Sequence, residues 1–211
     1  MHPSDDYALR NEKSFGKSEM WYILSADEGA GIYVGFNQDY DKKQIKEKLE
    51  DSTILETLNF FEVKPGETYM INPGTVHAIG AGVRLMEIQQ NSNLTYRLYD
   101  YLRKDRKGNY RELHIKKGLN VIDYSKFEKQ EVEGDLLAKN KYFTVKKQEV
   151  KNEAVIKADG KSFKTFTFLT GRGYVNDIPY NQFDTFFVPY GKEAKIQGNG
   201  LIIISEIEEL E

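Results

Sequence analysis

The feature of this sequence that most constrains its fold is a succession of short segments rich in aromatic and β-branched residues. Turn signals such as Pro65-Gly66 and Pro73-Gly74 separate them. The segments are MWYIL, GIYVGF, FFEV, TYMI, VRLMEIQ, LTYRLYDY, KYFTVKKQEV, FKTFTFL, FDTFFV and LIIIS. Such residues favour strands because they pack well on a pleated, half-buried surface. The pattern predicts a mostly β protein, either a sandwich or a barrel.

Residues 41–58 interrupt this β pattern. Their apolar side chains recur at spacings close to those of a helix, among Lys and Glu residues: Ile45, Leu49, Ile54 and Leu58. This periodicity predicts one amphipathic helix, or two short helices with a break between them.

A change in composition divides the chain. Residues 124–140 are polar and charged without a clear period, which is typical of a linker. We therefore expect a first domain over residues 1–125 and a smaller β domain over residues 126–211. The second domain contains no histidine, so any metal chemistry is expected in the first.

Charge and cysteine content exclude several classes of protein. The chain has 30 Lys and Arg and 33 Asp and Glu residues, without a long block of one sign, so we expect no binding to nucleic acid. Cysteine is absent, which excludes disulfides and thiolate metal sites. No apolar run has the length of a membrane span or the form of a secretory signal. We expect a cytoplasmic protein that does not bind membranes.

The three histidines are the candidate metal ligands. His77 follows the turn in NPGTVHAIG, where a new strand begins, and His2 precedes a loop that leads to Glu19 at the start of EMWYIL. Two imidazoles and a carboxylate suit Zn(II) with an open position or Fe(II) in a facial triad, and the spacing does not choose between them. His114 alternates with apolar neighbours and is interpreted as structural.

Each candidate also has an ordinary structural interpretation. A single histidine in a β protein is more often a surface or core residue than a ligand. Glu19 is typical of a solvent-facing strand position, and Lys17 of a solvated loop. The alternation around Glu87 allows its side chain to point either outward or into a barrel. Arg97 could pair with Asp100 along one strand face. Only the combination of these residues favours a functional site.

That combination resembles a known family. The strings HPSDDYA, GKSEMWYIL, NPGTVHAIGAGVRLMEIQQNSNLTYRLYDY and RELHIKKGLNVID look like those of the type I mannose-6-phosphate isomerases, in the short bacterial form. The resemblance runs from His2 to about Asp123. It implies a cupin-type jelly roll that carries one zinc ion, with a helical insertion at about residues 41–58 and a second, cupin-like β domain.

The resemblance also implies roles for individual residues. His2, Glu19 and His77 match zinc ligands of the family. Lys17 matches a lysine of the substrate pocket, expected to bind the phosphate. Glu87 and Arg97 match residues that line the same pocket, where they are expected to act in catalysis, with Arg97 also contacting the substrate. The implied reaction interconverts mannose 6-phosphate and fructose 6-phosphate by proton transfer through an enediol, with zinc as Lewis acid.

One departure from the family pattern lies at Met1. The family has a glutamine ligand two places before the histidine, in Gln-Val-His-Pro, whereas here Met1 directly precedes His2. The segment that precedes this glutamine in the family also has no counterpart. We therefore expect a truncated member with impaired activity, because ordering a chain end costs about 1 to 2 kcal/mol per residue. We expect a monomer, with weak self-association through exposed sheet edges.

Two functions of other classes remain open. A cupin with the same ligands could be an Fe(II) oxygenase, which metal analysis and an isomerase assay would distinguish. A protein that keeps the pocket without the metal would bind sugar phosphate without turnover. Stabilisation by mannose 6-phosphate in the absence of zinc would indicate this last function.

Overall fold

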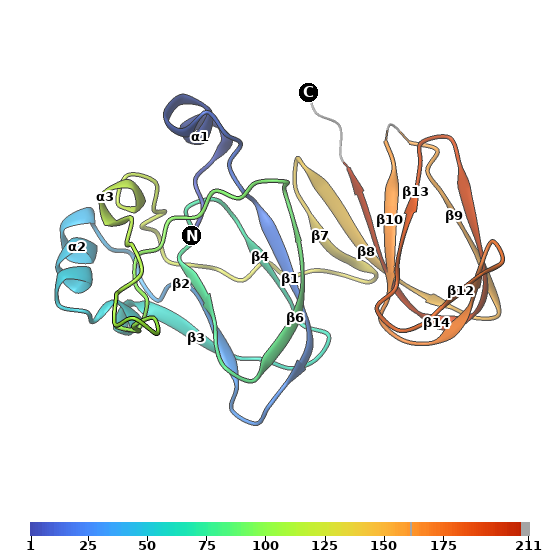
Figure 1. Cartoon of the computed structure of the whole chain (residues 1–211), viewed down its shortest axis with the longest axis horizontal. Helices are drawn as coiled ribbons and strands as arrows, with labels where there is room; N and C mark the ends of the chain where they lie inside the picture. Colours follow the sequence, from blue (N-terminus) through green and yellow to red (C-terminus); the bar gives the residue numbers. More distant parts are fainter. Residues whose placement is uncertain (161, 208–211) are drawn as a thin grey trace. The chain divides into compact units, whose positions relative to one another are not determined.

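The computed structural model of the chain describes residues 1–160 and 162–207 and divides into two units. Unit 1 comprises Met1–Gln130 and unit 2 comprises Glu131–Glu211. Strands predominate in both units, and the helices are few and short (Figure 1). The prediction of a mostly β protein is confirmed. None of the helices among the described residues is long and apolar enough to cross a membrane.

Unit 1 contains two three-stranded antiparallel sheets (Figure 1). In the first sheet the central strand β1 pairs with β4 and β6, and in the second β2 pairs with β3 and β5. The strands are β1 (Glu19–Ala26), β2 (Gly31–Phe36), β3 (Leu58–Glu62), β4 (Thr68–Ile71), β5 (His77–Ile79) and β6 (Val83–Gln89). One cluster of buried side chains draws on both sheets, including Trp21 and Ile23 from β1 and Ile32 and Val34 from β2. The two sheets therefore pack face to face.

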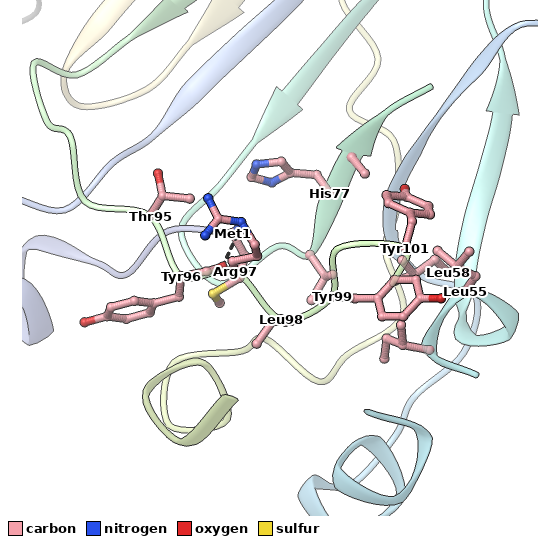
Figure 2. A pocket seen from close by; sticks show the side chains of 13 residues that line it. Met1, Leu55, Leu58, His77, Thr95, Tyr96, Arg97, Leu98, Tyr99 and Tyr101 are labelled. Atoms are coloured by element: carbon pink, nitrogen blue, oxygen red, sulfur yellow. Dashed lines mark hydrogen bonds between the residues drawn. The ribbon is translucent and has the colours of Figure 1, made fainter. Parts of the chain in front are cut away.

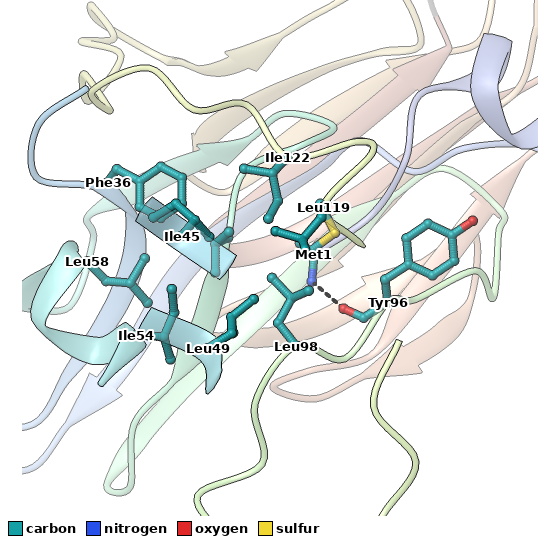
Figure 3. Close-up of a cluster of buried hydrophobic side chains, with 11 residues drawn as sticks. Met1, Phe36, Ile45, Leu49, Ile54, Leu58, Tyr96, Leu98, Leu119 and Ile122 are labelled. Carbon is teal, nitrogen blue, oxygen red and sulfur yellow. Dashed lines mark hydrogen bonds between the residues drawn. The ribbon is translucent and has the colours of Figure 1, made fainter. Parts of the chain in front are cut away.

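Helices cover one end of unit 1. They are α1 (Asp5–Glu12), α2 (Lys42–Glu50), the 3₁₀ helix η1 (Ile54–Thr57) and α3 (Ile115–Gly118). Asp41 and Gln44 form a reciprocal capping box at the start of α2, which satisfies two backbone N–H groups that the helix leaves free. The apolar residues of 41–58 then pack with α3 and Met1 in a second buried cluster (Figure 3). The prediction of two short helices with a break is confirmed here.

Two sequence predictions are wrong, one in unit 1 and one at the start of unit 2. Residues 94–101, predicted as a strand, have no sheet partner. Their backbone instead makes single hydrogen bonds, from Tyr96 N to Met1 O and from His114 N to Arg97 O. The predicted linker over residues 124–140 contains a strand, β7 (Leu136–Lys139). Leu137 and Ala138 are buried in it. This short apolar run therefore forms a strand although the residues before it are polar.

Unit 2 is built around one long strand. β14 (Glu193–Ile207) pairs with β8, β9, β10 and β11. It therefore connects the strands of this unit into one sheet. The other strands are β7, which pairs with β8, and then β8 (Phe143–Val150), β9 (Glu153–Lys157), β10 (Lys164–Phe168), β11 (Arg172–Val175), β12 (Ile178–Tyr180) and β13 (Thr185–Val188). The interior is apolar and aromatic. Phe168 stacks on Tyr180 with ring centroids 3.5 Å apart and meets Phe166 edge-on.

Candidate metal centre and cavity

Three side chains that are distant in sequence meet between the two sheets of unit 1. Glu19 is the first residue of β1, and His77 is the first residue of β5 in the opposite sheet. His2 lies just before Ser4, whose hydroxyl accepts from Tyr7 N and caps α1. The imidazole rings of His2 and His77 have centroids 5.0 Å apart. The structure therefore brings together the three residues predicted as metal ligands.

Backbone carbonyls fix the orientation of both imidazoles. His2 Nδ1 lies 2.8 Å from Leu94 O, and His77 Nδ1 lies 3.0 Å from Thr75 O. A carbonyl oxygen only accepts, so each Nδ1 carries the hydrogen and donates it. In the neutral form of each ring, Nε2 then carries the lone pair, which is the arrangement typical of metal-binding histidines.

These lone pairs face the carboxylate of Glu19. His2 Nε2 is 3.4 Å from Glu19 Oε2, and His77 Nε2 is 3.4 Å from Glu19 Oε1. Acceptors at such distances repel one another unless a metal ion or a proton lies between them. Two ligands held about 2.1 Å from a tetrahedral zinc are about 3.4 Å apart. Candidate ligand atoms of all three residues lie within 4.8 Å of one another, so the donor set fits a divalent metal.

Burial and charge keep Glu19 and His77 in the form that binds a metal. Glu19 is 1% exposed, and its Oε2 atom accepts no well-aligned hydrogen bond from the described residues. Burial raises the pKa of Glu19, but interactions with His2 and Lys17 outweigh it and hold the pKa below its usual value. Burial lowers the pKa of His77 well below its usual value. Glu19 is therefore an anion and His77 a neutral imidazole at pH 7.

The segment that carries His2 is held more firmly than the sequence led us to expect. Met1 O accepts from Tyr96 N, His2 O from Gly74 N, and Pro3 O from Lys17 N. The Met1 side chain is buried in the cluster of Figure 3. Backbone hydrogen bonds and apolar burial therefore offset the ordering entropy of residues 1–3.

Gly16 lets this segment lie directly against the loop before β1. A Cβ atom at Gly16 would lie 2.4 Å from Pro3 O and 2.5 Å from Asp5 N. Asp5 Oδ1 also accepts from Gly16 N at 2.8 Å. The absence of a side chain at Gly16 is thus required for His2 and Glu19 to share one site.

Lys17 and Glu87 lie beside the metal centre. Lys17 Nζ is 3.1 Å from Glu19 Oε2 and 3.8 Å from Glu87 Oε1, and it donates to Gln89 Oε1 at 2.6 Å. The Lys17 side chain is only 10% exposed, whereas that of Glu87 is 34% exposed. Trp21 Nε1 donates to Glu87 Oε2 at 3.2 Å. Lys17 is therefore already surrounded by acceptors, while Glu87 remains partly accessible.

Arg97 and His77 line a cavity of about 190 Å³ in unit 1 (Figure 2). Leu55 and Leu58, from the helical insertion, form part of its apolar wall, and Tyr101 borders it as well. Arg97 Nη1 donates to Glu112 O at 3.0 Å, so Arg97 does not pair with Asp100 along a strand face. The lining of this cavity includes neither Lys17 nor Glu87. The structure thus groups Lys17 and Glu87 with Glu19, whereas Arg97 lies with His77 in the lining of the cavity.

Sequence reasoning missed several residues that support the site. Trp21 meets the His77 ring edge-on with centroids 5.3 Å apart, and Gln89 fixes Lys17. A signal for both existed, because alternate residues of a strand share a face. Trp21 stands two places after Glu19, and Gln89 two places after Glu87. His114 Nδ1 accepts from Arg97 N at 3.1 Å, which agrees with its structural interpretation.

Comparisons with known proteins place the chain among sugar-phosphate isomerases. It is 36% identical to mannose-6-phosphate isomerase ManA of Bacillus subtilis over an alignment of 225 residues, which covers 98% of this chain and 70% of the relative. It is 33% identical to mannose-6-phosphate isomerase of Streptococcus mutans, covering 83% of this chain and 57% of the relative. The chain thus spans between 57% and 70% of the length of these two relatives. No protein-family model matches it.

A solved structure agrees with these relatives. The crystal structure of the mannose 6-phosphate isomerase from Bacillus subtilis superposes with a TM-score of 0.86 at 32% identity, covering 98% of this chain and 70% of that one. The similarity includes both units, because it extends over nearly the whole chain.

Proposed function

Because this chain belongs to the mannose-6-phosphate isomerase family, we propose that it interconverts mannose 6-phosphate and fructose 6-phosphate. The observation that carries the proposal is the group formed by His2, Glu19 and His77, whose candidate ligand atoms lie within 4.8 Å of one another. His77 also lines the cavity. An aldose and a ketose phosphate differ by the position of a carbonyl group. Their interconversion therefore needs a group that polarises the carbonyl, a base near the carbon, and a cation for the phosphate.

We propose that His2, Glu19 and His77 hold one zinc ion. Nitrogen and carboxylate ligands without sulfur suit Zn(II), and three protein ligands leave a position open. When bound, zinc supplies a Lewis acid that polarises the substrate oxygen. Leu94 O and Thr75 O orient the two imidazoles, so these carbonyls belong to the machinery that holds the metal.

Glu87 is the proposed group for proton transfer. Its carboxylate takes the proton from C2 of the aldose and returns it at C1, while the hydroxyl proton passes from O2 to O1, so that the aldose becomes the ketose through an enediol. The hydrogen bond from Trp21 Nε1 fixes one oxygen, and the partial exposure of Glu87 leaves room for substrate. Arg97 lines the cavity with a guanidinium that is permanently charged, which suits it to bind an anionic group of the substrate.

Two cations are proposed for the phosphate. The family resemblance favours Lys17 as the residue that binds the phosphate, but its ammonium group already faces Gln89, Glu19 and Glu87. Arg97 is half-buried and borders the cavity, and a guanidinium binds phosphate with two parallel hydrogen bonds. We therefore propose Arg97 as the main phosphate contact and Lys17 as the cation that neutralises the two carboxylates.

We also propose that unit 1 is a cupin-type jelly roll and that unit 2 is a second, cupin-like β domain. The support is the pair of facing antiparallel sheets in unit 1, with the candidate ligands between them. In this proposal the helical insertion closes one side of the barrel, because its residues line the cavity. We expect the protein to be a monomer that binds one sugar phosphate per chain.

A coupled assay tests the proposed activity. Purified protein is loaded with zinc and given mannose 6-phosphate, and fructose 6-phosphate is followed through phosphoglucose isomerase and glucose-6-phosphate dehydrogenase as NADPH. We expect turnover that is lost on chelation and restored by zinc. Glu87→Gln should lower kcat by about 100-fold or more, because general acid–base catalysis contributes about 10²- to 10⁴-fold. The exposed Glu62 gives the control, since Glu62→Gln should leave kcat unchanged.

The assay also distinguishes the two phosphate cations. Arg97→Lys keeps the charge but removes the fork of donors, so we expect a raised KM for mannose 6-phosphate. Lys17→Gln should lower kcat more than it raises KM. Metal analysis of the purified protein adds the third readout: iron in place of zinc, without isomerase activity, would favour an oxygenase, and binding without turnover would favour a sugar-phosphate binding protein.

A further inference from the structure

Residues 103–111 form a hairpin, here called the cationic hairpin. Lys104 and Tyr110 make an antiparallel bridge across it, and Lys104 Nζ lies 5.0 Å from the centre of the Tyr110 ring. Asp105 Oδ1 accepts from the backbone N atoms of Lys107 and Asn109 at 2.8 and 2.9 Å. The hairpin therefore has a defined structure that its own hydrogen bonds maintain.

The base of the hairpin is held by a buried carboxylate outside it. Asp100 is 8% exposed, and its Oδ1 accepts from Arg103 Nη2 at 2.5 Å and from Arg111 Nη1 at 3.3 Å. The hydrogen bond from Arg103 holds the pKa of Asp100 below its usual value. Asp100 stays ionised at pH 7 and ties both strands of the hairpin to the segment that lines the cavity.

The hairpin carries a concentrated positive charge. Five of its nine residues are basic and one is acidic, a net charge of +4 in a chain whose net charge is −3. Asp105 is engaged with backbone N–H groups, and Asp100 offsets charge only at the base. Arg106 and Lys107 are exposed, and their side chains have no ion-pair partner in the part of the chain that the structure describes. The positive charge at the tip of the hairpin is thus not neutralised by an ion pair with any described residue.

The cationic hairpin directly follows, in the sequence, residues that line the cavity. Arg97, Tyr99 and Tyr101 line the cavity in the residues that lead into the hairpin. Arg103 Cζ lies 5.5 Å from the centre of the Tyr101 ring, so the first residue of the hairpin contacts the cavity wall. A dianionic ligand that approaches the cavity therefore meets a positive field on this side.

We propose that the cationic hairpin attracts the phosphate of the sugar substrate to the cavity and raises its affinity, without taking part in the chemical step. This inference rests on the proposed function for the identity of the ligand. Charges near a site raise the local concentration and association rate of an oppositely charged ligand, and salt screens the effect. The hairpin side chains Lys104, Arg106 and Lys107 supply this attraction, since Arg103 and Arg111 are paired with Asp100.

The test is the triple variant Lys104→Gln/Arg106→Gln/Lys107→Gln in the full chain. Binding of mannose 6-phosphate is measured by titration calorimetry and kcat/KM by the coupled assay, both from about 10 mM to about 500 mM ionic strength. We expect Kd at low salt to rise about five-fold, with the difference falling below about two-fold at high salt, where the Debye length is only a few ångströms. The value of kcat should stay unchanged.

The control removes the same charge elsewhere in unit 1. Lys43→Gln/Lys46→Gln/Lys64→Gln changes three exposed lysines that do not line the cavity, and its salt dependence should match the wild type. If both triple variants show the same salt dependence of Kd, the inference is wrong. Turnover separates it from the proposed function: binding that depends on the hairpin without turnover overturns the isomerase, whereas turnover with unchanged salt dependence overturns only the role of the hairpin.

Discussion

The two units bury different kinds of side chain. Unit 2 encloses Phe166 and Phe168 at 0% exposure together with aliphatic residues, and its one buried polar residue among those described is Thr144. Unit 1 buries three charged side chains, Lys17, Glu19 and Asp100, in addition to the imidazole of His2. Both units are built from antiparallel strands, so strand architecture alone does not decide what the interior contains.

The buried charges of unit 1 lower its stability, and this cost indicates that they serve a function. Buried charges cost several kcal/mol each in desolvation, and a pair recovers this only with good geometry and further hydrogen bonds. One carboxylate oxygen of Glu19 accepts no well-aligned hydrogen bond from the described residues. Stability alone would not favour a buried oxygen in this state. We infer that unit 1 keeps these groups for binding, whereas unit 2 is a packed interior without such a demand.

The largest expected effect concerns packing in unit 2. Phe168→Ala removes a fully buried ring that stacks on Tyr180, and such a change lowers the free energy of unfolding by about 3 to 5 kcal/mol. Chemical denaturation followed by circular dichroism measures it. The control is Phe187→Ala, at a ring that is 59% exposed, which should cost less than about 1 kcal/mol. Equal costs for both variants would contradict the tightly packed interior.

The next prediction concerns the buried charge of unit 1. Glu19→Gln replaces the proposed anionic ligand by a neutral amide of the same shape, so zinc affinity should fall by more than about 100-fold, the upper end of what loss of an outer-shell partner costs. Zinc content after dialysis against a buffered zinc concentration measures this, together with His77→Ala. Glu62→Gln serves as the exposed control. Unchanged zinc content in both ligand variants would refute the site.

A third prediction concerns the contact that joins the His2 segment to the loop before β1. Gly16→Ala places a methyl group about 2.4 Å from Pro3 O, and overpacking of this kind costs about 2 kcal/mol. Because Pro3 must move, zinc affinity should fall as well. Gly160→Ala is the matched control, since a Cβ atom there meets nothing within 4 Å. A variant at Gly16 that binds zinc normally would show that His2 does not depend on this contact.

The sequence predicted the grouping of the candidate ligands better than their surroundings. A resemblance of long motifs singles out His2, Glu19 and His77, which the structure brings together, and the aromatic and β-branched segments predict the β character. Turn chemistry at Pro73-Gly74 placed His77 correctly at the start of a strand. These features are local, so short stretches of sequence contain them.

Features that depend on distant partners could not be predicted. Residues 94–101 alternate like a strand, but their backbone hydrogen bonds go to Met1 and His114 instead of a sheet neighbour. Lys17 reads as a solvated loop lysine, and only the pairing of Glu19 with Gln89 in the sheet shows that it is enclosed by acceptors. The positive charge of the hairpin is hidden in a chain of small net charge, because composition averages over all surfaces.

The smallest expected effect concerns an ion pair at the end of α1, the helix that follows His2. Glu12 accepts from Tyr96 Oη at 2.7 Å and pairs with Lys117 Nζ at 2.8 Å. These interactions, with Lys117 the stronger, hold the pKa of Glu12 below its usual value. Glu12→Gln should lower the free energy of unfolding at pH 7 by about 1 kcal/mol, because hydrogen bonds to a charged group are worth about 1.5 to 3 kcal/mol and the amide keeps part of them.

The pH dependence gives the sign of this effect. A carboxyl whose pKa is lowered in the folded state stabilises that state above its unfolded pKa of about 4.3, and the contribution is lost as pH falls through the folded pKa. The difference between wild type and Glu12→Gln, measured by denaturation, should therefore be constant above about pH 5 and decline as the pH falls below the unfolded pKa of about 4.3. Glu50→Gln breaks an exposed pair with Lys46 and should change stability by less than about 0.5 kcal/mol at every pH. A Glu12 effect that does not decline as the pH falls would assign it to packing of the helix end instead of to charge, and unit 1 would then owe less of its stability to ion pairs than its contrast with unit 2 implies.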